Sequence, residues 1–154
     1  IYGSEGGRHG GSSRDAVEKF WRWIIGGSAS ARFHRPESGI GLNNMARINI
    51  QSARKFLDTF DIFDAQPDAH HKLLSERKEN EAYLAYNPGQ QYAVYFTNGG
   101  EINLDLTSTE GSYHLRWLDI SRSEWTKHTT IKGGGVVALE APGMGQYVAV
   151  LTKS

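Results

Sequence analysis

The hydrophobic pattern of the chain changes its period near residue 80. Upstream, Val17, Phe20, Trp21 and Ile24 recur at i, i+3, i+4 and i+7, a spacing that places one apolar stripe along a helix. Downstream, apolar and polar residues alternate, which is typical of strands with one buried face. The pattern therefore predicts a helical part and a strand-rich part, with the polar run from Ser75 to Asn80 as the boundary.

The helical part opens with a glycine-rich loop and a well-marked helix start. Ser12 and Asp15 fit a capping box, and Gly26-Gly27 stop the helix because glycine takes the left-handed cap without strain. Short strands over residues 1–3 and 28–34 flank this helix, which gives a βαβ unit of the kind that repeats in α/β barrels. Two further helices are predicted, from Met45 to about Phe63 and from Pro67 to Leu74.

The strand-rich part contains seven strand-length segments separated by turn residues. Asn98-Gly99 is the strongest hairpin signal among these separators, because a type I′ turn needs positive φ at both central residues. The spacing predicts a small antiparallel β-sandwich with one apolar face per sheet. The expected strands are residues 82–87, 91–97, 101–106, 112–119, 125–132, 136–140 and 146–152.

Composition and charge exclude several classes of protein. The 154 residues are 38% hydrophobic and 11% aromatic, enough for a packed core, and the net charge of zero offers no electrostatic footprint for nucleic acid. No apolar run is long enough to span a membrane. There is no cysteine, so thiol chemistry and disulfides are excluded. His70-His71 lack a third ligand at a fitting spacing, and we expect neither a metal nor a cofactor.

Glu5 is the candidate catalytic residue, because it follows the first strand and precedes the glycine-rich loop, where an α/β barrel carries its site. An ordinary solvated loop carboxylate is the alternative. Arg32, His34 and Arg35 end the second strand, where they would face the same rim and supply hydrogen-bond donors for a bound substrate. A structural salt bridge and a loop cap are equally good interpretations. His9 is a further substrate-binding candidate, with a plain loop residue as its alternative.

The first part of the chain resembles a known enzyme family. The W-R-W helix followed by G-G-S-A-S-A-R-F-H-R-P looks like the seventh helix and eighth strand of the two-glutamate (β/α)8 glycoside hydrolases. This resemblance implies that Glu5 matches the nucleophile of a retaining mechanism, in which a second carboxyl group protonates the leaving oxygen. The acid/base glutamate would lie upstream of Ile1, so the chain is not expected to be active alone.

The second part resembles the C-terminal β-sandwich family named for collagen binding, which follows a glycosidase barrel in many bacterial enzymes. The resemblance rests on Y-A-V-Y-F-T-N-G-G-E-I-N-L-D-L, Y-H-L-R-W-L-D-I and G-G-G-V-V-A-L-E-A-P-G-M-G-Q-Y-V-A-V-L, which occur in this order. The family name is not itself evidence that this chain binds collagen.

The two resemblances together predict an α+β chain with two domains. Residues 1–79 would be the C-terminal βα units of a TIM-type barrel, and residues 80–154 an antiparallel β-sandwich of about seven strands that buttresses the barrel. The parent would be an extracellular or periplasmic bacterial glycoside hydrolase acting on poly- or oligosaccharides, of which this chain, opening on Ile1 with a clipped strand, is the C-terminal piece. A non-catalytic sandwich that binds carbohydrate or a matrix protein is the alternative. The oligomeric state stays open.

Overall fold

The computed structural model describes residues 13–28, 43–126 and 128–154. In this part the chain forms two α-helices, one 3₁₀ turn (η1) and ten strands, most of them in the second half. Their bounds are α1 Ser13–Ile25, α2 Asn44–Thr59, η1 Ile62–Asp64, β1 Gln66–Pro67, β2 Leu74–Ser75, β3 Ala82–Asn87, β4 Gln91–Phe96, β5 Glu101–Asp105, β6 Ser112–Asp119, β7 Glu124–Trp125, β8 Thr129–Lys132, β9 Val136–Glu140 and β10 Tyr147–Lys153.

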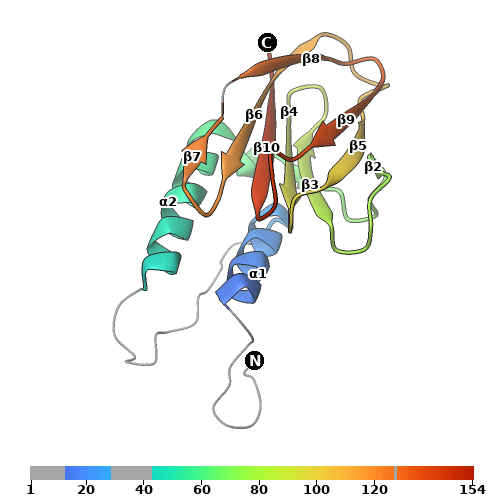
Figure 1. Cartoon of the computed structure of the whole chain (residues 1–154). Helices are drawn as coiled ribbons and strands as arrows, with labels where there is room; N and C mark the ends of the chain where they lie inside the picture. The colour runs from blue at the N-terminus through green and yellow to red at the C-terminus, as the bar shows by residue number, and fades with distance from the viewer. Residues whose placement is uncertain (1–12, 29–42, 127) are drawn as a thin grey trace.

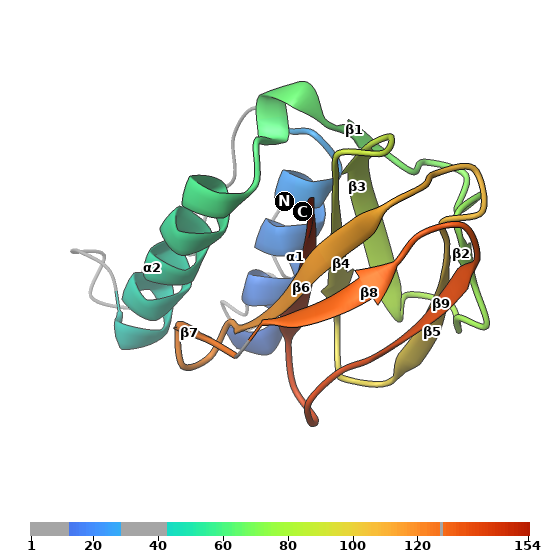
Figure 2. The same ribbon diagram turned by 90° about the horizontal axis from the view of Figure 1, so that it is seen from above.

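The elements are arranged in three layers. The middle layer is a seven-stranded sheet with the order β1-β3-β4-β10-β6-β7, in which β8 also pairs with β6. A three-stranded sheet, β2-β5-β9, covers one face of it, and the two helices cover the other, as the two views show (Figure 1, Figure 2). Every strand pair in both sheets is antiparallel.

Strand β4 shows how the layers share the core. All six of its residues are buried, because successive side chains point to opposite faces and both faces are covered. Tyr92, Val94 and Phe96 pack with the three-stranded sheet, whereas Ala93 and Tyr95 pack with the helices. The prediction that Tyr92, Val94 and Phe96 share a face is confirmed. The expectation of a single apolar face per sheet is wrong for this sheet.

Helix α1 begins and ends within a residue of the predicted positions. Most of its apolar stripe is buried, with Trp21 fully inaccessible and Phe20 8% exposed, whereas Ile24 is half-buried. At the end, Gly27 takes a φ of 77°, its N–H donates to Ile24 O at 3.1 Å, and Ser28 N–H donates to Trp23 O at 2.9 Å. This pair of bonds is the Schellman motif that glycine favours, and it satisfies carbonyls that the helix leaves unpaired.

Helix α2 is shorter than the sequence pattern predicts. Asn43 caps its start by accepting from Ala46 N–H at 2.8 Å. The helix ends at Thr59, because Phe60 is extended (φ −117°, ψ 122°) and the next backbone group is held by β4: Gln91 Oε1 accepts from Asp61 N–H at 3.0 Å. Ile62 and Phe63, which the prediction assigned to the end of the helix, belong to η1 instead.

The short helix predicted from Pro67 to Leu74 is wrong. Gln66–Pro67 is an edge strand beside β3, a position that tolerates the missing N–H of proline. The Asp68 carboxylate then accepts from the backbone N–H groups of Lys72 and Leu73, each at 3.0 Å. Such local side-chain bonds compete with helical ones, so the backbone turns and Leu74 enters β2.

Asn98-Gly99 does not connect a hairpin, contrary to the prediction. Strands β4 and β5 belong to different sheets, so this turn carries the chain from one layer to the other. Gly99 N–H donates to Gly145 O at 2.7 Å, and a Cβ at Gly99 would collide with the carbonyl oxygen of Gly143. The glycine is therefore needed for close approach of two backbones as well as for its positive φ of 62°.

The expected fold class is also wrong. The described residues form a β-rich domain with two helices and antiparallel sheets, and no β/α repeat of a TIM-type barrel occurs among them. A barrel repeat needs a parallel strand pair, whereas all the pairs in the two described sheets are antiparallel. Both helices pack instead on the sheet built from the second half of the chain. The sequence pattern predicted the helices correctly, but it did not predict the sheet against which they pack.

Replacing Gly99 by alanine should destabilise the chain more than replacing Gly134. Both glycines have positive φ, which costs an L-residue about 1–2 kcal/mol, but a Cβ at Gly134 has no atom within 4 Å. We expect urea unfolding to show a larger loss for Gly99→Ala, by about 1 kcal/mol or more, because the collision adds to the strain. Equal losses in the two variants would show that the close approach to Gly143 is not needed.

Candidate functional site

The residues predicted to carry the chemistry lie outside the described residues. This holds for Glu5, the catalytic candidate, and for His9, Arg32, His34 and Arg35, the substrate-binding candidates. The structure therefore neither brings them together nor separates them, and their roles stay predictions. The most organised arrangement in the described part is the junction between α1, α2 and the main sheet, which sequence reasoning did not identify as a site.

Trp21 is the centre of this junction. Its ring stacks on Tyr95 of β4 with centroids 6.2 Å apart and meets Phe56 of α2 edge to face at 5.6 Å. Its indole N–H donates to Asn49 Oδ1 at 2.6 Å inside the core. Aromatic contacts of this geometry add to the free energy of burial, and the indole bond orients both side chains. One residue thus connects both helices to the sheet.

Asn49 is an unusual member of this core. It is only 2% exposed, and its Nδ2 has no hydrogen-bond partner among the described residues. A polar residue on the apolar face of the predicted second helix is the signal that could have identified it. Asn49 also lines a mainly apolar cavity of about 480 Å³ between the N-terminal turns of α1 and α2 and the loops of the sheet, together with Arg14, Val17, Met45, Ile48, Asn98, Ile120, Ser121, Gly145 and Gln146.

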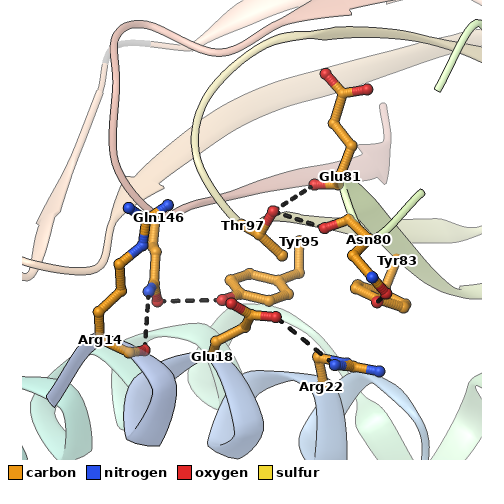
Figure 3. A network of polar contacts seen from close by, with 9 residues as sticks. All are labelled: Arg14, Glu18, Arg22, Asn80, Glu81, Tyr83, Tyr95, Thr97 and Gln146. Carbon is orange, nitrogen blue, oxygen red and sulfur yellow. Dashed lines mark hydrogen bonds and ion pairs between the residues drawn. The ribbon is translucent and has the colours of Figure 1, made fainter. Parts of the chain in front are cut away.

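A polar network surrounds the aromatic contact and is drawn in Figure 3. The Tyr95 hydroxyl donates to Gln146 Oε1 at 3.1 Å, and Gln146 Nε2 donates to the backbone oxygen of Arg14 at 3.4 Å. Burial raises the pKa of Tyr95 far above its usual value, and the nearby Glu18 carboxylate raises it further. Tyr95 therefore stays protonated and acts as a fixed hydrogen-bond donor.

Tyr83 of β3 extends the network toward the surface. The guanidinium groups of Arg22 and Arg77 lie 4.9 and 5.6 Å from its ring centroid, a cation–π geometry. The Tyr83 hydroxyl donates to Asn80 Oδ1 at 2.6 Å, and Thr97 Oγ1 donates to Asn80 O at 2.7 Å. These contacts attach the polar run before β3 to α1 and to β4.

Several carboxylates of the described part cap turns of the backbone. The pKa of Asp105 is lowered because its side chain accepts from the hydroxyl and the backbone N–H of Thr107. A glycosidase general acid needs the opposite, a raised pKa. Other carboxylates accept from backbone N–H groups in the same way: Asp61, Asp68, Glu81 and Asp119.

Other kinds of site find no support in this part of the chain. Among the residues that the structure describes, no three His, Asp or Glu side chains are grouped so that they could hold a metal ion. Neither α1 nor α2 is long and apolar enough to cross a membrane. The junction can position the helices and exclude water, and it has the character of a structural support.

Trp21→Phe should destabilise the chain, because it removes the indole donor and leaves the buried Asn49 amide without a partner. We expect a loss of about 1–3 kcal/mol in urea unfolding. The double variant Trp21→Phe/Asn49→Leu should recover part of this loss, since an apolar pair leaves nothing unsatisfied. Trp23→Phe is the matched control, because Trp23 is 41% exposed. Equal losses at positions 21 and 23 would contradict the role of the indole bond.

Acid should weaken the fold through His71. Burial, followed by the charge of Arg77, lowers its pKa below the ordinary 6.5, although Asp68 partly opposes this. Below about pH 6.5 the unfolded chain therefore binds a proton that the folded chain does not, and stability falls as the pH drops through the folded pKa. The urea midpoint should decrease less between pH 7 and pH 5 in His71→Asn, because asparagine tolerates the φ of 50° at this position. His70→Asn removes only the smallest of the contributions that lower the pKa of His71, so it should change the pH dependence less than His71→Asn.

No known protein-family model and no curated protein matches the chain. Solved structures do resemble it. A glycoside hydrolase superposes with a TM-score of 0.75 at 15% identity, over 98% of this chain and 39% of its own. A glycoside hydrolase family 5 protein from Bacteroides vulgatus gives a TM-score of 0.74 at 15% identity, over 94% of this chain and 36% of its own. The chain thus has a fold related to part of a glycoside hydrolase and spans less than two fifths of either structure.

Proposed function

We propose that this chain is the C-terminal part of a glycoside hydrolase that acts on O-glycosidic bonds of poly- or oligosaccharides. The observation that carries the proposal is that nearly the whole chain, 98% of it, superposes on a glycoside hydrolase of which it spans only 39%. A likeness confined to a common small domain would not include the helices together with both sheets. The carbohydrate substrate follows from this relationship.

The two parts of the chain have different roles in this proposal. Residues 1–79 belong to the catalytic domain and lend both helices, β1 and β2 to its junction with residues 80–154, which form an accessory domain that supports it. The contacts favour a supporting role, because the face of the main sheet toward the helices is apolar and is buried against them. The sheet residues buried there are Ala85, Ala93, Tyr95, Leu118, Ile120, Val148 and Val150. An interface of this kind holds two elements in one fixed position.

The alternative role, a module that binds carbohydrate or a matrix protein, would be favoured by an exposed aromatic row on a sheet. In the described ranges, the aromatic side chains with high exposure are Trp23 and Phe63, and neither lies on a strand. The strand aromatics Tyr92, Tyr95 and Tyr113 are fully buried. We therefore propose that residues 80–154 support the catalytic domain rather than bind carbohydrate or a matrix protein.

The catalytic chemistry assigned to residues 1–36 is part of the same proposal. Glu5 would attack the anomeric carbon, and a glutamate upstream of Ile1 would protonate the leaving oxygen and then activate water, so that the configuration is retained. Arg32 and Arg35 would keep the Glu5 carboxyl ionised, since a nearby positive charge favours the anion. His34 and His9 would hold sugar hydroxyls. The resemblance of this segment to the two-glutamate enzymes supports the assignment.

Glu5→Gln in the complete enzyme tests the assignment. We expect the rate of glycoside hydrolysis to fall on the order of 10³-fold or more, because glutamine cannot form the glycosyl intermediate. Glu110→Gln is the matched control, since Glu110 is an exposed turn residue, and it should keep full activity. Activity within a few-fold of the unmodified enzyme would remove Glu5 from the mechanism. A complete protein that hydrolyses no glycoside would overturn the function itself.

A further inference from the structure

The turn that follows α2 presents an apolar side chain to solvent. Phe63 in η1 is 98% exposed, and Leu57 in the last turn of α2 is 44% exposed. Both line one cavity of about 390 Å³, together with Asp58, Thr59, Phe60, Asp61, Ile62 and Gln91. We call this surface the Phe63 patch. A phenylalanine exposed to this degree leaves apolar surface in water, and a partner that covered this surface would gain the free energy of burying it.

The Phe63 patch is held in place by hydrogen bonds on both sides. Gln91 of β4 clamps the backbone of Asp61: its Nε2 donates to Asp61 O at 2.7 Å, and its Oε1 accepts from Asp61 N–H at 3.0 Å. Asp61 Oδ1 accepts from Phe63 N–H at 3.0 Å, and Asp64 Oδ2 accepts from Asn87 Nδ2 at 2.8 Å. The patch is therefore preorganised, and a partner would lose little free energy in ordering it.

The charge around the patch is negative. The end of α2 and the turn after it carry three aspartates, Asp58, Asp61 and Asp64, and the sequence has neither lysine nor arginine between Lys55 and Lys72. Two of them, Asp58 and Asp61, line the cavity itself. A complementary surface would offer an apolar pocket for Phe63 with lysine or arginine around it, because opposite charges at the rim of an interface select the partner and its orientation.

We propose that the Phe63 patch docks into such a pocket on the part of the same glycoside hydrolase polypeptide that lies outside residues 1–154. This inference rests on the proposed function. The length of the solved relatives supports it, since the match covers 39% and 36% of their chains and leaves more than half of each outside. Gln91 and Asn87, which hold the patch, come from the strand-rich part, so the docked turn would join the accessory domain to the remainder of the enzyme.

Crosslinking of the complete gene product tests the docking. Phe63 is replaced by the photoreactive residue p-benzoylphenylalanine, and Met144, which is 76% exposed on the loop before β10, receives it as the control. After irradiation we expect position 63, and not position 144, to be joined within one molecule to a peptide outside residues 1–154. A crosslink between two copies, a crosslink within residues 1–154, no crosslink, or a gene product no longer than this chain would each overturn the proposal.

A second pair of variants tests the docking without the photoreactive residue, which could itself disturb the turn. Phe63→Ser should lower the thermal unfolding midpoint of the complete protein by about 2–4 °C and increase amide exchange at residues 61–65, whereas Met144→Ser should change neither. No change at Phe63→Ser would overturn the docking. So would suppression of the position-63 crosslink by cellohexaose or xylohexaose, which would assign the patch to a glycan.

The two proposals fail in different ways. A correct crosslink in a complete protein that hydrolyses no glycoside would support the docking of this turn onto the rest of its chain and overturn the enzymatic function. Glycoside hydrolysis that depends on Glu5, without the crosslink, would keep the function and overturn the docking.

Discussion

Strands β4 and β10 are apolar on both faces, and the other layers of the structure depend on this constraint. Tyr92, Val94, Ala149 and Leu151 face the three-stranded sheet, while Tyr95, Val148 and Val150 face the helices. Leaving either face in water would expose most of the apolar surface of these central strands, at about 25 cal/mol per Å². The three-stranded sheet and the helix pair are therefore both required for the main sheet to be stable.

Directional bonds then decide how the helices sit on the sheet. The indole of Trp21 is tied to Asn49, Ser52 Oγ donates to Ile120 O at 2.7 Å, and Lys55 Nζ donates to Ser123 O. Apolar burial supplies most of the free energy but accepts many orientations, whereas a buried hydrogen bond left unmade costs about 1–3 kcal/mol. The combination gives one packing of α2 against the end of β6 and one of α1 against β4. The proposed supporting role would need this kind of rigidity.

The contacts of the carboxylates and tyrosines in the described part agree with the proposed supporting role. Carboxylates that could serve in catalysis elsewhere, such as Asp68 and Asp105, are engaged with backbone groups of their own turns. Tyrosines that could bind sugars by stacking, such as Tyr92 and Tyr95, are fully buried. Phe63 is the most exposed of the large apolar side chains in the described part, it lies on a turn fixed by Gln91, and the proposed docking would cover it with further polypeptide. In the proposed function residues 80–154 support the catalytic domain, and the proposed chemistry belongs to residues outside the described part.

Local sequence determined much of the secondary structure. The capping residues and Gly26-Gly27 mark α1 to within a residue of its bounds, and alternation places β3, β6 and β9 at the predicted positions, because both signals depend only on neighbours along the chain. The expected segment at 125–132 is split into β7 and β8. The candidate site at Glu5 stays a prediction from a resemblance.

Tertiary structure alone decided which surfaces meet. Asn98-Gly99 has the sequence of a hairpin turn, yet it joins two sheets, because β4 finds its partners in β3 and β10. The apolar stripe of α1 predicts a buried face but not that Tyr95 covers it, and so the βα units expected from it were wrong. The polar residue Asn49 is buried, whereas the apolar residue Phe63 is exposed. Burial depends on contacts between residues far apart in the chain, and a local pattern carries no information about those contacts.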